Sequence, residues 1–194
     1  MDISSFQKNL KEQTSNLHTQ AENHPVMQSF VKGTFKKEHL LRFLINIKPC
    51  YDVVEQRMLQ PYICKMPELK RTQEIQKDID LLSKDVEPSQ LGDLLTPLEC
   101  TDLWLGWCWS KPVEMLKSEL YVRWLADLYG GRIMARGMGV YVNTVTFNEP
   151  KQVIGCVRAL LDTPNMVVTE DDIIEDTLLF FDYHLDLFKA IQNE

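Results

Sequence analysis

An imidazole and a carboxylate are separated by one helical turn near the N-terminus. In the segment 10–22, four polar side chains share one face of a helix at steps of four, three and four residues: Lys11, Ser15, His18 and Glu22. A neutral imidazole is a common metal ligand, and a carboxylate on its second ring nitrogen fixes the tautomer and raises the basicity of the ring. The spacing is equally typical of a locally paired, solvated histidine.

Lys11 and His18 are two helical turns apart, which is about 10.5 Å along the axis at 1.5 Å per residue. This separation is similar to that between a haem iron and the propionates at the ring edge, and histidine is a standard ligand of haem iron. The spacing therefore makes His18 a candidate ligand of a haem iron, and a solvated or locally paired histidine remains the alternative. We expect His24 and His39 to be exposed, and His184 to be packed in the C-terminal helix.

A second segment with potential catalytic residues, 121–132, contains an acid followed by two glycines. Gly130 and Gly131 weaken a helix by about 1 kcal/mol each relative to alanine, but they allow a ligand to approach the backbone closely. Asp127, one turn earlier, can organise water and relay protons without coordinating a metal. The alternative is a helix that ends at the glycines, with Asp127 on a solvated face.

The elements that must position these residues are predicted to be helices throughout. Apolar residues recur at three- and four-residue spacings in most of the chain. We expect the first helix to be capped by Ser4 or Ser5 and the last helix by Thr169. Between them we expect a helix over 36–60 that is kinked or divided at Pro49, and a further helical segment over 67–82. Residues 83–99 are predicted to form a loop with a short helix, and residues 144–147 an extended connector. The predicted fold is a single all-α domain spanning residues 1–194.

Composition narrows the classes of function. The 194 residues are 44% hydrophobic and 25% charged, with a net charge of -7, which argues against a nucleic-acid partner. The five cysteines are odd in number and form no C-x-x-C pair, as is typical of a reducing compartment. The polar N-terminus lacks a signal-peptide core, and no apolar run is long enough to span a membrane. We expect a soluble, cytoplasmic protein with no membrane partner.

Four segments together resemble the haem oxygenase family. The pattern L-K-E-x-T-x-x-x-H-T-x-A-E around His18 is similar to the family's proximal helix. The others are the P-E-L-K-R turn at 67–71, the Y-V-R-W-L-A-D-L-Y-G-G segment at 121–131, similar to the distal helix, and L-D-L-F at 185–188, similar to the final helix. They occur in the family's order and cover nearly the whole chain.

The resemblance implies a role for each candidate residue. His18 would be the axial iron ligand and Glu22 its orienting partner; Asp127 would anchor distal water, and Gly130 and Gly131 would contact the haem with their backbone. Lys11, Tyr121 and Arg158 would meet the propionates, with Lys151 as a competitor of Arg158. Three residues depart from the family pattern: Ala126 replaces a glycine, Tyr129 a serine and Arg132 a glutamine. These departures affect the shape of the distal pocket.

The implied activity is oxidative cleavage of haem, as both substrate and cofactor, to biliverdin with release of carbon monoxide and ferrous iron. It requires O2 and external electrons from ferredoxin or a flavoprotein reductase, since the sequence has no flavin or nicotinamide fingerprint. A bilin reductase would be a downstream partner. Lys36, Lys37 and Arg42 are either part of a docking patch for the reductase or a solvated helix start.

Three other classes remain open. One is a haem-binding protein that stores, senses or delivers haem without degrading it. Another is a helical di-iron oxidase, which requires several carboxylates and histidines from different helices, whereas the chain has four histidines and no E-x-x-H motif. The third is a purely structural helical bundle.

Overall fold

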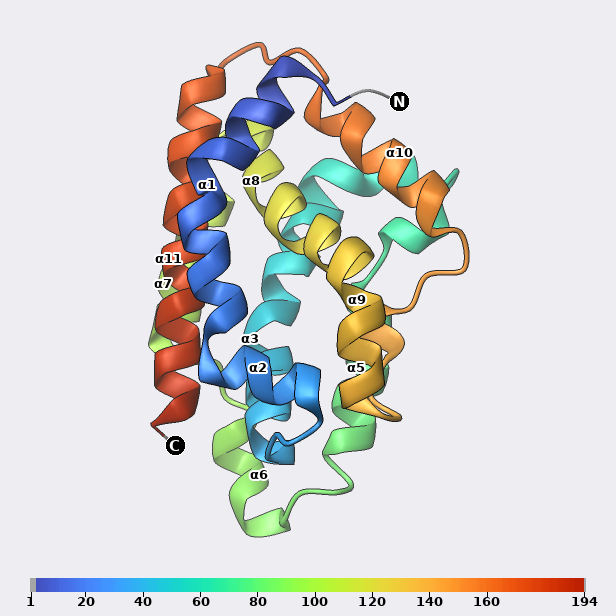
Figure 1. Cartoon of the computed structure of the whole chain (residues 1–194), viewed down its shortest axis with the longest axis vertical. Coiled ribbons are helices and arrows are strands. Elements are labelled where there is room, and N and C mark those ends of the chain that lie inside the picture. The colour runs from blue at the N-terminus through green and yellow to red at the C-terminus, as the bar shows by residue number, and fades with distance from the viewer. Residues whose placement is uncertain (1–2, 194) are drawn as a thin grey trace.

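The computed structural model describes residues 3–193, and the regular structure within that range is entirely helical (Figure 1). The α-helices are α1 (Ser5–Asn23), α2 (Pro25–Lys32), α3 (Lys37–Val54), α4 (Gln60–Ile63), α5 (Thr72–Leu82), α6 (Pro88–Leu94), α7 (Glu99–Ser110), α8 (Lys117–Glu119), α9 (Leu125–Met138), α10 (Pro150–Leu161) and α11 (Glu170–Gln192). Two π-helical turns, Glu55–Leu59 and Leu120–Trp124, join α3 to α4 and α8 to α9. Short 3-10 turns occupy Pro67–Leu69, Val113–Leu116 and Asn143–Val145. The predicted all-α fold is confirmed.

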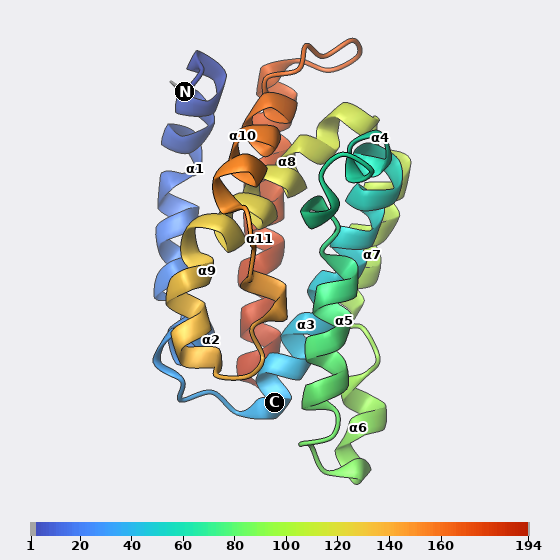
Figure 2. The same ribbon diagram turned by 90° about the vertical axis from the view of Figure 1, so that its right-hand side faces the viewer.

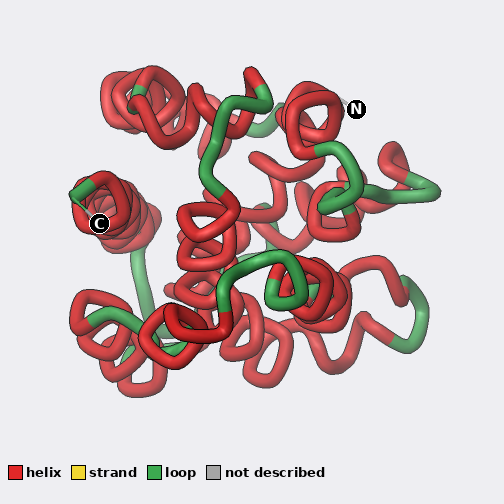
Figure 3. The backbone as a smooth tube through the Cα atoms, turned by 90° about the horizontal axis from the view of Figure 1, so that it is seen from below, coloured by secondary structure: helices red, strands yellow, loops and turns green. Residues whose placement is uncertain are grey.

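The helices form a bundle around α3, which runs through its middle (Figure 1). The N-terminal helix α1 packs along the last helix α11, and α2 packs against both α1 and α9. The view from the side shows α9 and α5 on either side of the 3-10 turn Asn143–Val145, which contacts both helices (Figure 2). Seen from below, the helices are joined by short loops (Figure 3).

Both predicted helix starts are confirmed by their caps. The Ser4 hydroxyl accepts a hydrogen bond from the Gln7 amide at the start of α1. Thr169 caps α11, where its side chain and that of Asp172 bind each other's backbone amides in a capping box. The buried stripe of α1 includes Leu10, which packs with residues of α11, so the cap and the packing place α1 along α11.

Several local predictions are wrong. Pro49 neither ends nor divides α3, which continues through it to Val54. Residues 144–147 are not an extended connector, because Asn143–Val145 form a 3-10 turn. His24 and His39 are half-buried rather than exposed, whereas His184 is buried as expected.

Candidate active site

The proximal candidates lie on the accessible face of α1. The His18 Nδ1 atom is 3.5 Å from a Glu22 carboxylate oxygen, and the two side chains are 50% and 65% exposed. The His18 ring also contacts Phe181 of α11 edge-on, with the ring centroids 6.1 Å apart. The predicted pair therefore exists, and Nε2 is the ring nitrogen that Glu22 leaves for a metal.

The distal acid has the opposite surroundings. Asp127 lies in the first turn of α9 and is 1% exposed. One carboxylate oxygen accepts a hydrogen bond from the Tyr51 hydroxyl, and the other is 3.1 Å from Nη2 of Arg123. The Arg123 Nε atom also donates to the Tyr51 hydroxyl at 3.1 Å, which closes the cluster. The interpretation of Asp127 as a residue on a solvated face is therefore wrong.

Burial shifts the pKa values of two groups in this distal cluster upward. Burial raises the pKa of Asp127 above its usual value, although the positive charge of Arg123 acts in the opposite direction. Burial also raises the pKa of Tyr51 well above that of an exposed tyrosine. A raised pKa brings a carboxyl group closer to the range in which general acids exchange protons.

Tyr51 and Arg123 were not predicted from the sequence as residues of this site. Arg123 had a usable signal, because it precedes Asp127 by four residues in an otherwise apolar stretch. Tyr51 had none, because it lies on α3, 76 residues from Asp127 in sequence. Only the packing of α3 against the distal helix brings its hydroxyl to the carboxylate.

The two adjacent glycines have different surroundings, and α9 runs through both without a break. A Cβ atom on Gly131 would lie 2.7 Å from the Val145 carbonyl oxygen, whereas a Cβ on Gly130 would have nothing within 4 Å. Gly131 is therefore required by packing inside the protein. Of the two glycines, only Gly130 has open space beside its α-carbon, and the helix ends at Gly139, with a φ of 67°.

The turn that presses on Gly131 is held by two buried polar residues. Arg71 donates through Nη2 to the carbonyl oxygens of Asn143 and Thr144, at 2.6 and 2.7 Å. The Asp78 carboxylate accepts hydrogen bonds from the backbone amides of the same two residues. These contacts make a 3-10 turn favourable where an extended connector was predicted.

A glycine contact missed in the sequence sets the position of the distal helix. A Cβ on Gly137 would lie 2.0 Å from the Phe30 carbonyl oxygen, so α9 and α2 approach backbone to backbone. Gly33 ends α2 in the left-handed conformation, and a Cβ there would lie 2.9 Å from the Gly137 oxygen. Since α2 follows α1 directly, this contact holds the distal helix relative to the proximal one.

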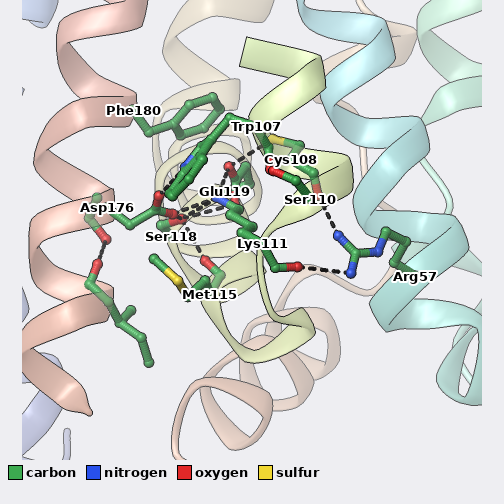
Figure 4. Close-up of polar contacts among 12 residues, drawn as sticks. Arg57, Trp107, Cys108, Ser110, Lys111, Met115, Ser118, Glu119, Asp176 and Phe180 are labelled. Carbon is green, nitrogen blue, oxygen red and sulfur yellow. Dashed lines mark hydrogen bonds and ion pairs between the residues drawn. The ribbon is translucent and has the colours of Figure 1, made fainter. Parts of the chain in front are cut away.

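A buried charged cluster lies at the start of the helix that leads into α9 (Figure 4). The Lys111 ammonium is 2.6 Å from Glu119 and 2.5 Å from Asp176 of α11, and Trp107 donates to Asp176 at 2.7 Å. Burial would lower the pKa of Lys111, but the two carboxylates raise it above its usual value. These bonds join α7, α8 and α11 directly before the π-helical turn that contains Arg123.

The candidates for the propionates are spread over three segments. Lys11 is exposed on α1, and Tyr121 is half-buried, with its hydroxyl 3.5 Å from the Thr14 hydroxyl. Arg158 of α10 donates to the Tyr129 hydroxyl at 2.7 Å, and Tyr129 is 51% exposed. The side chain of Tyr129, one of the three departures from the family pattern, therefore points outward, where its hydroxyl accepts a hydrogen bond from Arg158. The other departures, Ala126 and Arg132, are half-buried and exposed, and the competitor Lys151 is exposed.

The predicted reductase patch is only partly at the surface. Lys36 and Lys37 are exposed, and Lys37 is 3.2 Å from Asp85. Arg42 is 8% exposed and donates to the carbonyl oxygens of Asp93 and Thr96. The assignment of Arg42 to a docking patch is therefore wrong.

The chemistry of the site suits haem. His18 offers an accessible imidazole nitrogen, and Gly130 leaves open space along the backbone of α9. Lys11 and Ser15, on the His18 face of α1, also line a surface hollow with Ile3, Lys8 and Glu12. Among residues 3–193, no three or more His, Cys, Asp or Glu side chains are arranged to hold a metal ion, and no helix is long and apolar enough to cross a membrane.

A heme oxygenase from Porphyra purpurea is 27% identical over 143 residues, which cover 69% of this chain and 59% of the relative. The chain thus matches less than two thirds of that relative's length. Heme oxygenase-1 from Synechocystis sp. PCC6803 in complex with heme has a TM-score of 0.77 at 20% identity, covering 98% of this chain and 93% of that one. Heme oxygenase from Leptospira interrogans has a TM-score of 0.76 at 22% identity, covering 96% and 100%.

These structural similarities, at 20–22% identity, show the fold. The family is shown by the sequence, because the family model described as Heme oxygenase matches residues 4–155. That range includes the His18–Glu22 pair, Tyr51, and the segment from Tyr121 through Gly131. The chain belongs to the heme oxygenase family.

Proposed function

We propose that the protein binds haem between α1 and α9 and cleaves it to biliverdin, releasing carbon monoxide and ferrous iron. The observation that carries this proposal is the buried Asp127 carboxyl group, held by Tyr51 and Arg123 on the distal helix. A haem-binding protein without catalysis has no need for a buried acid with a raised pKa beside its ligand.

Each residue of the site has a distinct task. His18 binds the iron through Nε2, while Glu22 orients the imidazole through Nδ1. When bound, haem supplies both the iron at which O2 reacts and the ring that is opened. Asp127 holds a proton and passes it through ordered water, and its contacts with Arg123 and Tyr51 keep the carboxyl group in place.

The remaining residues bind and shape the substrate. Gly130 lets the haem plane approach the backbone of α9, because no side chain fills that space. Lys11, Tyr121 and Arg158 bind the propionates, and Arg158 gives up its hydrogen bond to Tyr129 to do so. Electrons come from ferredoxin or a flavoprotein reductase, for which Lys36 and Lys37 form part of the docking surface. A bilin reductase consumes the product.

Hemin titration followed by turnover tests this proposal. Purified protein should give a saturable Soret shift at one hemin per chain. Addition of O2 with ascorbate, or with ferredoxin and its reductase, should then replace the Soret band by a verdin spectrum with release of carbon monoxide. Saturable binding without verdin would instead indicate a haem-storage or delivery protein. That second candidate is favoured by Ala126, whose methyl group lies where the family has glycine.

A further inference from the structure

Three large apolar side chains are exposed where α7 lies beside α11, and the proposed reaction does not use them. Leu103 and Trp107 of α7 are 70% and 42% exposed, and Leu179 of α11 is 54% exposed. Leu103 and Trp107 are one helical turn apart, so they share a face of α7. We call these three residues the seam patch.

The contacts beneath the seam patch bring its residues together. Trp104 stacks on Phe180 with the ring centroids 4.9 Å apart. Leu103 directly precedes the first of these rings and Leu179 the second, so the two leucines flank the seam at one level. The axes of packed helices are about 8–10 Å apart, which one partner helix can cover. Single exposed apolar residues are ordinary, whereas a cluster of them with a polar rim is typical of an interaction site.

Trp107 is held in one orientation by the buried charged cluster. Its indole nitrogen donates to Asp176 at 2.7 Å, and the Asp176 carboxylate is 2.5 Å from the Lys111 ammonium (Figure 4). The Lys111 and Asp176 side chains are 0% and 1% exposed, so they fix the indole from inside the protein. A side chain that is already fixed loses little conformational entropy on binding, and tryptophan is enriched among residues that dominate binding energy.

Gly106 leaves open space beside Trp107 on the exposed face of α7. A Cβ atom at this position would have nothing within 4 Å outside its own helix. By helical spacing, Leu103 and Trp107 border this space. It can receive an apolar side chain from a partner.

The rim of the seam patch is acidic. Glu175 and Asp182 lie one turn before and one turn after Leu179, and all three are exposed. α7 contains no lysine or arginine, and Lys189, the one lysine of α11, is 2.9 Å from Asp186. The two helices therefore surround the apolar centre with an excess of negative charge.

We propose that the seam patch docks a basic protein partner, which places an apolar side chain beside Trp107 and its lysine or arginine side chains against the acidic rim. Complementary charge attracts such a partner and selects it, and an arginine can also stack on the exposed indole. A symmetric dimer through this patch would bring two acidic rims together, and a membrane with anionic lipids would repel it. A basic amphipathic helix laid along the seam matches both the apolar centre and the rim.

A synthetic peptide tests this surface in the haem-free protein, so the result does not depend on hemin binding. The probe is a fluorescein-labelled helical peptide with leucines on one face and arginines on the other, and a second peptide carries glutamates in place of the arginines. Fluorescence anisotropy should show saturable binding of one arginine peptide per chain, weakened by salt, and no binding of the glutamate peptide. In NMR spectra, the indole N–H signal of Trp107, assigned by its absence in Trp107→Phe, should shift on binding. No saturable binding, equal binding of the two peptides or an unshifted Trp107 signal would overturn the proposal.

Matched variants locate the binding site. Leu103→Gln and Leu179→Gln remove apolar surface from the seam patch, whereas Val140→Gln and Ile133→Gln do so at two residues elsewhere that are 70% and 56% exposed. We expect each variant of the patch to weaken peptide binding about tenfold, as for residues at a binding hot spot, and each control to change it less than about twofold. Equal losses in the two pairs would overturn the proposal.

Two further changes test the open space and the rim. Gly106→Gln should fill the space and weaken binding about tenfold without lowering the unfolding temperature, because the helix gains a better helix former. Glu175→Gln should weaken binding at low salt and reduce its salt dependence, whereas Glu87→Gln, at an exposed acid before α6, should change neither. Unchanged binding in Gly106→Gln, or equal effects of the two glutamate variants, would overturn the proposal.

Sedimentation and vesicle binding test the other occupants of the patch. We expect Leu103→Gln to change neither the oligomeric state nor the binding to vesicles of phosphatidylcholine and phosphatidylserine. A wild-type dimer that Leu103→Gln dissociates would show that a second copy covers the patch. Vesicle binding that the same variant abolishes would show that a lipid surface covers it, and either result would overturn the proposal.

Discussion

The two residues that we place on opposite sides of haem, His18 and Asp127, have opposite surroundings. His18 is half-exposed and has one loose contact, with Glu22 on its own helix. Asp127 is buried and is held by Tyr51 from α3 and by Arg123. An iron ligand must remain reachable until haem binds, whereas a proton carrier must be kept away from bulk water. The proximal pair therefore comes from one helix and is accessible to solvent, whereas the distal cluster is built by residues of several helices.

The largest expected effect removes the proximal ligand. His18→Ala should abolish the imidazole-type haem spectrum and verdin formation, while the free energy of unfolding of the haem-free protein should change by less than about 0.5 kcal/mol, because the side chain is half-exposed. Visible spectroscopy and denaturant titration measure the two effects. His24→Ala is the control: it should keep the ligation but cost about 1 kcal/mol, because His24 caps α2. Unchanged ligation in His18→Ala would mean that another residue binds the iron.

Removal of the distal acid should leave hemin binding intact but lower both the rate of turnover and the stability of the fold. Asp127→Ala should retain hemin binding but lower the rate of verdin formation by about 100-fold, a typical loss for a general acid. It should also destabilise the haem-free protein by about 3 kcal/mol, since Arg123 is left buried without its carboxylate. Single-turnover spectra and urea unfolding measure these changes. Full verdin formation would refute the proton-carrier role, and a stability equal to that of the wild type would refute the importance of the buried pair.

The adjacent glycines of α9 allow a similar comparison, between a residue required for packing and a residue that leaves space for a ligand. Gly131→Ala should destabilise the haem-free fold by about 1–3 kcal/mol, because its methyl group meets the Val145 backbone oxygen. Gly130→Ala should stabilise that fold by up to about 1 kcal/mol through helix propensity, and should weaken hemin binding instead. Thermal unfolding and hemin titration of the two variants separate packing from ligand approach. Equal effects on both properties would show that the two positions are equivalent.

The smallest expected effect is the acid sensitivity due to His184. Its pKa is about 3 in the folded protein and near 6.5 when unfolded, so the unfolded chain takes up the proton first as the pH falls. The free energy of unfolding should therefore decrease below pH 6.5, by at most about 1.4 kcal/mol per pH unit. Urea unfolding at pH 7 and pH 5 should show this loss in the wild type and a smaller loss in His184→Gln.

Other titrating groups affect this measurement in known directions. Burial raises the folded pKa of Asp127 and Glu119, so these groups favour the folded state as the pH falls. The pKa of His24 is lowered by burial and by Lys189, so a residual loss remains in His184→Gln. All three groups are present in both proteins, and the difference between the two proteins isolates His184. The same acid loss in both would contradict the neutral, buried state of this ring.

Much of the fold was predictable because its signals are local. The Ser4 and Thr169 caps are recognised from residues within one helical turn, and both are observed. The helix does not end at Pro49, which was one of the two outcomes predicted there, because the packing of α3 outweighs the local effect of proline. The 144–147 connector failed because Arg71 and Asp78, far away in sequence, bind its backbone.

By itself, the sequence determined the helical class, the family and the His18–Glu22 pair, since these depend on residue types at short, regular spacings. Only the tertiary structure decided that Tyr51 bonds to Asp127, that Gly131 faces Val145 while Gly130 faces open space, and that His184 has an unsatisfied nitrogen. The physical reason is that burial and hydrogen-bond partners on the distal side come from segments tens of residues apart, whose contacts exist only after the helices have packed.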